Sequence, residues 1–146
     1  PPYDRQPIRI NDEAEVSNSA VSPGCVIEGR VWHSVLSPGV IVEKGAFIND
    51  SIIMHDVVIK SGTSVSRCII DKRVVIGRNC AIGTGNPENA NNEFPEQLNS
   101  GITLIGKRAK IPNNTKMGTN CIVYPMATKA DLRGLSVKDG STLEKL

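Results

Sequence analysis

Aliphatic residues recur along this chain at steps of six, six and five positions, so that a pattern of 17 residues repeats. The stretches 35–51, 52–68 and 69–83 align at this spacing. Neither a helix, with its period of 3.6, nor a plainly alternating strand produces such a series. The series consists of Ile10, Val16, Val21, Ile27, Val31, Leu36, Val42, Ile48, Ile53, Ile59, Val65, Ile70, Ile76 and Ile82, and it resumes with Ile105, Ile111, Met117 and Val123.

Two further columns accompany the aliphatic one within the six-residue steps. The fourth residue after the aliphatic position is always small: Ala14, Cys25, Val40, Ala46, Val57, Thr63, Val74, Cys80, Ala109, Thr115 or Cys121. The third is mostly Gly, Asn or Asp, the residues that best tolerate positive φ, and it departs from them at Glu13, Arg73 and Arg108. Each step therefore predicts a short strand, a left-handed corner and a small residue inside the bend.

Three such sides make a triangular coil, and stacked coils make a parallel β-helix of hexapeptide repeats. We expect about five coils, in residues 10–83 and 101–124. A sandwich of short strands is the alternative, but it does not explain three columns in register.

Three segments fall outside the repeat. Residues 84–100 form a polar inserted loop, in which Phe94 could dock back onto the prism, and loops of this length are usually functional or disordered. Residues 125–146 are expected to be a C-terminal cap or tail, with an edge strand possible at 132–137. Residues 1–9 are expected to be a linker or a cut end.

Composition narrows the function classes. The net charge of +2 is no general nucleic-acid signature, and the absence of a long apolar run or a signal peptide favours a cytoplasmic protein without membrane contact. The four cysteines form no CxxC pair, and both histidines lie far from any tight cysteine cluster, so no zinc site is expected. A disulfide framework is not expected in a chain of this size without secretory signals. Cys25, Cys80 and Cys121 fall in the small inward column, and Cys68 takes the position of Ser34 and Ser51 in neighbouring coils.

Candidate chemistry comes from stacking the corners. Since the five-residue step always closes the same corner, the turns 54–56, 71–73 and 106–108 should lie one above another, about 4.8 Å apart. That brings together Lys72, Arg73, Lys107 and Arg108, with His55 one coil below. Like charges stacked so closely indicate either a bound anion or a solvated basic edge that deters strand pairing, and the sequence leaves both open.

Several stretches resemble the C-terminal domain of ADP-glucose pyrophosphorylase (glucose-1-phosphate adenylyltransferase): "GCVIEG", "HSVLSPGV", "DSIIMHDVVI", "RCIIDKRVVIG" and "SGITLIGKRAKIP". The resemblance implies a left-handed β-helix that supports assembly into a homotetramer and binds an anionic metabolite effector. It places effector contacts at Lys72 and Lys107, whereas Arg73, Arg108 and His55 depart from the family pattern.

The resemblance also implies a partner domain, an N-terminal catalytic part that joins ATP and glucose 1-phosphate into ADP-glucose and pyrophosphate, with Mg²⁺ bound to the ATP. This chain shows no glycine-rich nucleotide loop or strand–helix alternation, so we expect the 146 residues alone to be inactive, with no catalytic residue or cofactor of their own.

Three alternatives remain beside this reading. The chain could be a stand-alone hexapeptide acyltransferase with His33 or His55 as general base. It could belong to another sugar-phosphate nucleotidyltransferase. It could also be a structural solenoid without a ligand.

Overall fold

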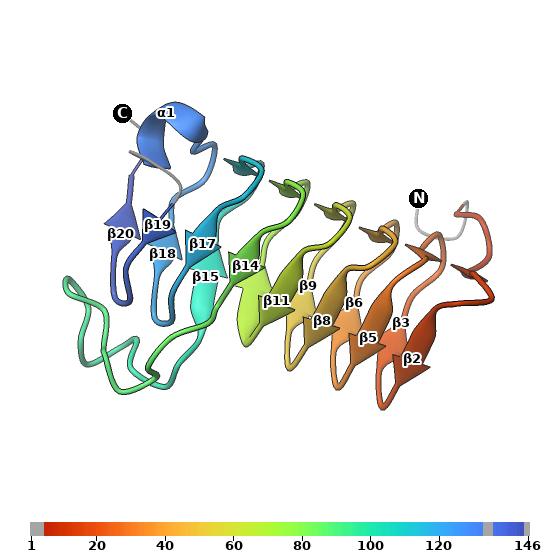
Figure 1. Ribbon diagram of the computed structural model, residues 1–146, viewed down its shortest axis with the longest axis horizontal. Helices are drawn as coiled ribbons and strands as arrows, with labels where there is room; N and C mark the ends of the chain where they lie inside the picture. The colour runs from red at the N-terminus through yellow and green to blue at the C-terminus, as the bar shows by residue number, and fades with distance from the viewer. Residues whose placement is uncertain (1–4, 133–135, 145–146) are drawn as a thin grey trace.

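The computed structural model describes residues 5–132 and 136–144, and their strands form three parallel sheets around a prism (Figure 1). Neighbouring strands in a sheet come from successive coils. Sheet A contains β1 (Arg9–Ile10), β4 (Val26–Ile27), β7 (Ile41–Val42), β10 (Val58–Ile59), β13 (Val75–Ile76) and β16 (Lys110–Ile111). Sheet B contains β2 (Glu15–Ser17), β5 (Arg30–Trp32), β8 (Phe47–Asn49), β11 (Ser64–Ser66), β14 (Ala81–Ile82), β17 (Lys116–Met117) and β19 (Ser136–Val137). Sheet C contains β3 (Ala20–Val21), β6 (Val35–Leu36), β9 (Ile52–Ile53), β12 (Cys68–Ile70), β15 (Thr103–Ile105), β18 (Ile122–Val123) and β20 (Thr142–Leu143).

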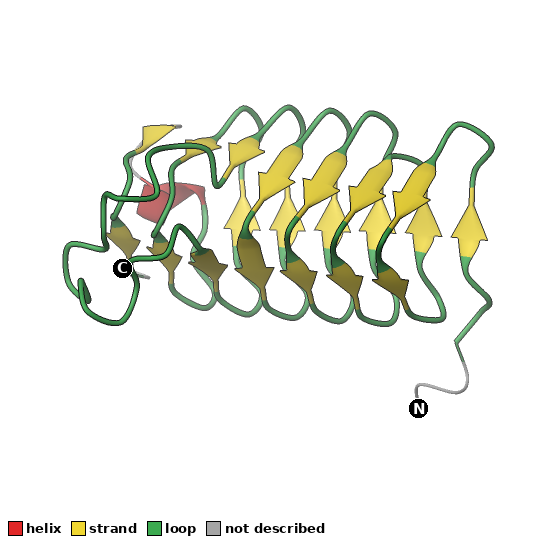
Figure 2. Cartoon of the chain, turned by 90° about the horizontal axis from the view of Figure 1, so that it is seen from below, coloured by secondary structure: helices red, strands yellow, loops and turns green. Residues whose placement is uncertain are grey.

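The predicted fold class, an all-β left-handed parallel β-helix of hexapeptide repeats, is confirmed. There are more coils than the five expected, because sheets B and C each have seven strands and sheet A has six. The six strands of sheet A already exceed five, and at the C-terminal end the tail adds a seventh strand to each of the other two sheets, β19 to sheet B and β20 to sheet C. A single helical turn, α1 (Lys129–Leu132), precedes them (Figure 2).

The aliphatic column fills the prism, and from Ile27 to Val123 every member is buried. The first coil differs: Ile10 is 51% exposed, and Val16 and Val21 are only partly buried. Their strands are the edge strands of the three sheets, so within the described residues no further coil covers them. The repeat identifies inward positions, and the end of the solenoid determines how far they are covered.

The corners follow the second column. Positive φ occurs at every six-step third position from Gly24 onward, including Arg73 (58°) and Arg108 (61°), whereas Glu13 does not adopt it. The small column lies inside, and all four cysteines are free and buried as the repeat predicts. Burial in this apolar interior raises the pKa of Cys68 to about 12, which keeps the thiol protonated.

One side of one coil is shorter than the others. Ile27 to Val31 spans four residues where the same side elsewhere spans six. Gly29 makes this short turn possible, since a Cβ there would overlap the carbonyl oxygen of Ala46 in the next coil.

The inserted loop contains no helix or strand, yet it is held against the last coils. The fully buried Asn91 donates to the Asn120 carbonyl and to Thr142 Oγ1, both at 3.0 Å. Leu98 is 7% exposed, whereas Phe94 remains 38% exposed, so Leu98 and not Phe94 packs inward. The turn is held by other contacts, since Phe94 N–H donates to Asn91 Oδ1 and Leu98 N–H donates to the Phe94 carbonyl.

The expected edge strand at 132–137 is present in part as β19, while residues 133–135 lie outside the described residues. Pro1 to Asp4, which belong to the expected linker 1–9, also lie outside them. No helix in the described part of the chain is long and apolar enough to span a membrane.

Candidate functional site: a basic corner of the solenoid

The turns 54–56, 71–73 and 106–108 join sheet C to sheet A, and we call this stack the basic corner. Their alignment follows from the strands before them, because Ile53, Ile70 and Ile105 are register partners in sheet C. Backbone hydrogen bonds continue the register through the turns. Arg73 N–H donates to the His55 carbonyl and Arg108 N–H donates to the Lys72 carbonyl, each at 2.9 Å. The stacked turns therefore lie as the repeat predicts, with the inserted loop leaving this corner undisturbed.

A hollow of about 430 Å³ opens over the basic corner. All five residues singled out from the sequence line it: His55, Lys72, Arg73, Lys107 and Arg108. Two more residues, Arg5 and Asp56, complete the lining. Sequence reasoning missed both, because Arg5 precedes the repeat and Asp56 fits the Gly/Asn/Asp column as an ordinary corner residue.

Positive charge dominates the hollow. Lys72 has a weak contact with the neighbouring Asp71, at 3.9 Å between Nζ and Oδ1. Among residues 5–132 and 136–144, Arg73, Lys107 and Arg108 form no ion pair. Clustered cations without carboxylate partners repel one another, and an anion would offset that repulsion.

The backbone at Arg73 and Arg108 adds a second observation. A left-handed conformation costs a residue with a Cβ roughly 1–2 kcal/mol, which Gly at the same position avoids. Gly24 and Gly39 occupy this position in the first two coils. Long cationic side chains at strained positions are consistent with a functional requirement for charge there.

His55 and Asp56 complete the electrostatics of the hollow. His55 Nδ1 is buried and has no hydrogen-bond partner among the described residues. The hydrogen bonds from Arg5 lower the pKa of Asp56 most, while desolvation opposes them and the charges of Arg73 and His55 add to the lowering. Asp56 is therefore a carboxylate, and Arg5 is its partner.

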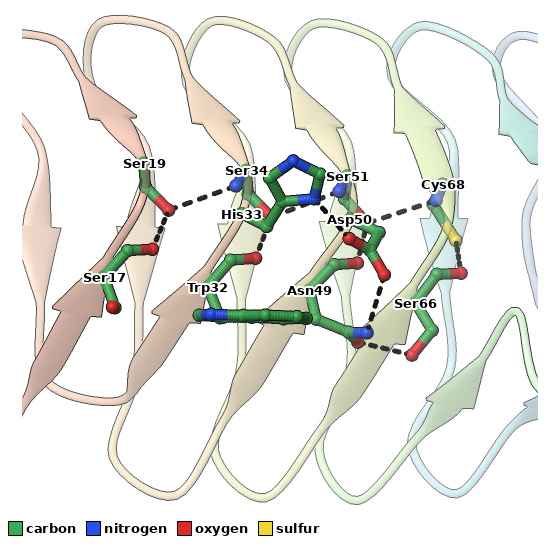
Figure 3. Close-up of polar contacts among 10 residues, drawn as sticks. All are labelled: Ser17, Ser19, Trp32, His33, Ser34, Asn49, Asp50, Ser51, Ser66 and Cys68. Atoms are coloured by element: carbon green, nitrogen blue, oxygen red, sulfur yellow. Dashed lines mark hydrogen bonds and ion pairs between the residues drawn. The ribbon is translucent and has the colours of Figure 1, made fainter.

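His33, the other histidine considered as a general base, lies on a different corner, where sheet B turns into sheet C (Figure 3). Its Nδ1 lies 2.6 Å from Asp50 Oδ1, and 69% of its side chain is exposed. The structure therefore does not bring the two histidines together. Across the described ranges, no three His, Cys, Asp or Glu side chains are grouped to hold a metal ion.

The corner of His33 also carries a ladder of polar side chains, which we call the serine corner and which consists of Ser19, Ser34, Ser51 and Cys68 (Figure 3). Each of the first three hydroxyls accepts a hydrogen bond from the backbone N–H of the next member, at 3.0–3.1 Å. Every member also donates to the carbonyl two residues earlier. Cys68 thus replaces a serine at the end of the ladder, as the sequence alignment of the coils predicts.

Comparison with known proteins assigns the chain to a family. Residues 7–105 match the family model described as "GlmU-like, C-terminal hexapeptide". The chain is 39% identical over 137 residues to the glucose-1-phosphate adenylyltransferase of Acetivibrio thermocellus, covering 93% of this chain and 32% of that protein. It is 43% identical over 144 residues to the enzyme of the same name from Thermomicrobium roseum, covering 98% of this chain and 34% of that protein. The chain thus spans about a third of the length of these relatives.

Solved structures share the fold at low sequence identity. The acetyltransferase domain of PglB from Neisseria gonorrhoeae, in complex with acetyl coenzyme A, aligns with a TM-score of 0.58 and 19% identity, covering 96% of this chain and 55% of that one. A hexapeptide transferase family protein from Anaplasma phagocytophilum aligns with a TM-score of 0.52 and 10% identity, covering 94% of this chain and 70% of that one. These likenesses concern the fold alone. The chain belongs to the GlmU-like, C-terminal hexapeptide family, and it is similar to part of the glucose-1-phosphate adenylyltransferases.

Proposed function

We propose that this chain is the C-terminal oligomerisation and effector domain of a cytoplasmic glucose-1-phosphate adenylyltransferase. A preceding catalytic part would form ADP-glucose and pyrophosphate from ATP and glucose 1-phosphate, with Mg²⁺ bound there beside the nucleotide. The relatives of that name support the assignment, since they match nearly the whole of this chain over about a third of their own length. The direct test is the coding sequence upstream of Pro1. A glycine-rich nucleotide-binding start is the expected result, and an unrelated domain would contradict the assignment.

The observation behind the effector role is the hollow at the basic corner. Four cationic side chains from two adjacent turns line it, and its 430 Å³ suits a small metabolite. Their charge favours a ligand with at least two negative charges, such as a phosphorylated sugar or acid. The buried His55 Nδ1 offers a further polar contact.

The effector role can be tested by thermal unfolding with fructose 1,6-bisphosphate, 3-phosphoglycerate, AMP and sulfate. We expect at least one phosphorylated metabolite to raise Tm, because a ligand that binds only the folded chain stabilises it. Lys72→Ala and Lys107→Ala should each reduce the increase. Lys116→Ala is the charge-matched control, since Lys116 lies on sheet B away from the hollow. No stabilisation by any anion, or full stabilisation of both lysine variants, would exclude an effector site here.

The oligomerisation role is supported by the outer face of sheet C. Val35 and Ile52 are 46% and 44% exposed, and Ile69, Leu104 and Ile122 continue the same outward row. A contiguous apolar face of this kind marks a protein contact surface. We expect a mass measurement of the parent protein to give a tetramer and Ile52→Lys to dissociate it, whereas a wild-type monomer would contradict this role.

A hexapeptide acyltransferase is the second candidate, and the pair His33–Asp50 favours it. A carboxylate 2.6 Å from Nδ1 orients an exposed imidazole as a general base would require. This candidate predicts a trimer, stabilisation by acetyl coenzyme A and loss of acyl transfer in His33→Ala. Absence of binding to acetyl coenzyme A would remove it.

A further inference from the structure

The segment in front of the first strand is fastened to the basic corner through Arg5. The Arg5 side chain runs past two corners whose left-handed residue is a glycine, Gly24 and Gly39. A Cβ at Gly24 would lie 3.1 Å from Arg5 Cδ, and a Cβ at Gly39 would overlap both Arg5 Nη1 and Asp56 Oδ1. The two glycines therefore form a trough for the Arg5 side chain, and a residue with a Cβ at either position would obstruct it.

Arg5 ends in a bidentate ion pair with Asp56. Nη1 lies 2.5 Å from Oδ1 and Nη2 lies 2.9 Å from Oδ2, and both side chains are about one-third exposed. The backbone is docked as well, because Gly24 N–H donates to the Gln6 carbonyl at 2.5 Å and Arg9 N–H donates to the Cys25 carbonyl at 2.9 Å. We call this arrangement of Arg5, Gln6 and Asp56 the latch.

The latch lies at the rim of the proposed effector site, since Arg5 and Asp56 both line the hollow. In the docked state Arg5 adds a cation to the lining and neutralises Asp56. In the undocked state that cation is gone and the Asp56 carboxylate faces the hollow alone, near Arg73 and His55. The hollow is therefore one charge more positive when the segment is docked.

We propose that the latch couples occupancy of the basic corner to the position of the segment that enters the solenoid, so that a bound polyanion holds residues 5–9 in the trough. This inference rests on the proposed effector function and adds a route by which the site acts on what precedes it. An anion prefers the docked state because of its extra positive charge, and by thermodynamic linkage it must stabilise docking by the same factor. Arg5 has five N–H donors and uses two groups on Asp56, so it can contact the anion without leaving its partner.

Amide exchange of Gly24 reads out docking directly, because its N–H is bonded to the segment itself. With inorganic pyrophosphate as the probe, we expect exchange at Gly24 to slow about fivefold or more at saturation, within the usual range of coupling between sites. In Arg5→Gln the slowing should disappear, and the affinity for pyrophosphate, measured by calorimetry, should fall by the same factor.

Gly39→Ala breaks the latch without changing any charge, because the new Cβ occupies the position of the ion pair. Gly45→Ala is its matched control. Gly45 has nearly the same φ (78° against 80°), but its Cβ would meet only Gly62, at an ordinary 3.5 Å. We expect Gly39→Ala to lose the coupling and Gly45→Ala to keep it, although both carry the same backbone strain.

The outcomes separate the two proposals. If pyrophosphate binds, Lys107→Ala abolishes binding, and Arg5→Gln and Gly39→Ala bind as the wild type does, the effector function stands and the latch is overturned. If neither pyrophosphate nor any of the four anions named above binds the wild-type chain, the effector function and the coupling both fall. In that case faster Gly24 exchange in Arg5→Gln without ligand would show only that Arg5 fastens the segment.

Discussion

Two corners of the same prism use polar residues in opposite ways. At the serine corner each side chain of the ladder from Ser19 to Cys68 has a hydrogen-bond partner in the next coil or two residues back (Figure 3). At the basic corner the cations of Arg73, Lys107 and Arg108 have no ion-pair partner in the described ranges. Polar groups at a solenoid corner therefore indicate a ligand where the chain itself leaves them without a partner.

Removal of a hydroxyl from the ladder tests the serine corner most directly. Ser51→Ala should lower the free energy of unfolding by about 1–3 kcal/mol, because the buried Cys68 N–H loses its acceptor. Urea unfolding measures the change. Lys107→Ala, an exposed change at the basic corner, should stay within about 0.5 kcal/mol while it weakens anion binding. Equal losses of stability in both variants would contradict the distinction.

Cys68→Ser tests the ladder in the other direction. Serine restores the residue that neighbouring coils place at this position, and its hydroxyl can donate to the Ser66 carbonyl as the thiol does. We expect the free energy of unfolding to change by less than about 1 kcal/mol, and assembly and anion binding to stay as in the wild type. A collapse of anion binding in this variant would mean that Cys68 has a role beyond packing.

Relief of the backbone strain at the basic corner should raise the free energy of unfolding by about 1 kcal/mol, whereas Ser51→Ala lowers it. Arg108→Gly removes the cost of a side chain at φ 61° and should raise the free energy of unfolding, while it weakens stabilisation by sulfate. Arg78→Gly is the control, since Arg78 lies at another corner, between sheets A and B, without positive φ, and the variant should lose stability. Destabilisation by Arg108→Gly would show that its side chain contributes to folding.

Acid should loosen the inserted loop selectively. Desolvation alone would raise the pKa of Asp139, but hydrogen bonds from Thr119, Asn89 and Asn86 lower it below its usual value. A carboxyl whose pKa is lower in the folded chain stabilises at pH values above its ordinary pKa and loses that contribution as the pH falls through the folded pKa. Protection of the Asn86 and Thr119 amides should therefore be constant above about pH 5 and fall below about pH 4.

Asp139→Asn is the control for that experiment, and its protection should be low at every pH. Amides of the serine corner, such as that of Ser51, should show no such dependence, because their acceptors are hydroxyls. Parallel loss of protection at both places would indicate global acid unfolding instead.

Salt should have the smallest effect. Screening of the stacked cations should raise the free energy of unfolding by a few tenths of a kcal/mol between 0.05 and 0.5 M NaCl. In the double variant Lys72→Ala, Lys107→Ala this rise should shrink, as thermal unfolding would show. An undiminished rise would place the repulsion elsewhere.

The sequence predicted what the period dictates. Ile70 and Ile105 are 35 residues apart, yet their shared side of the prism follows from the repeat, and with it the stacking of Lys72 on Lys107. Arg5 could not be found in this way, because its partner Asp56 is 51 residues distant and no spacing links them. Asn91 and Asp139 could not be predicted for the same reason, since they lie in segments without a repeat and act through their own side-chain contacts.

The shortened side at Gly29 makes one coil different in length from the others, so that it cannot pair in the place of another coil. Coils with nearly equal spacing could pair one step out of register at little energetic cost, and repeat proteins misassemble in this manner. A coil with a four-residue side cannot be exchanged for one with six, because the backbone at Gly29 approaches the Ala46 carbonyl so closely that a Cβ there would overlap it. The irregular side therefore fixes the register of the coils near the start of the solenoid, and the later coils follow from that register.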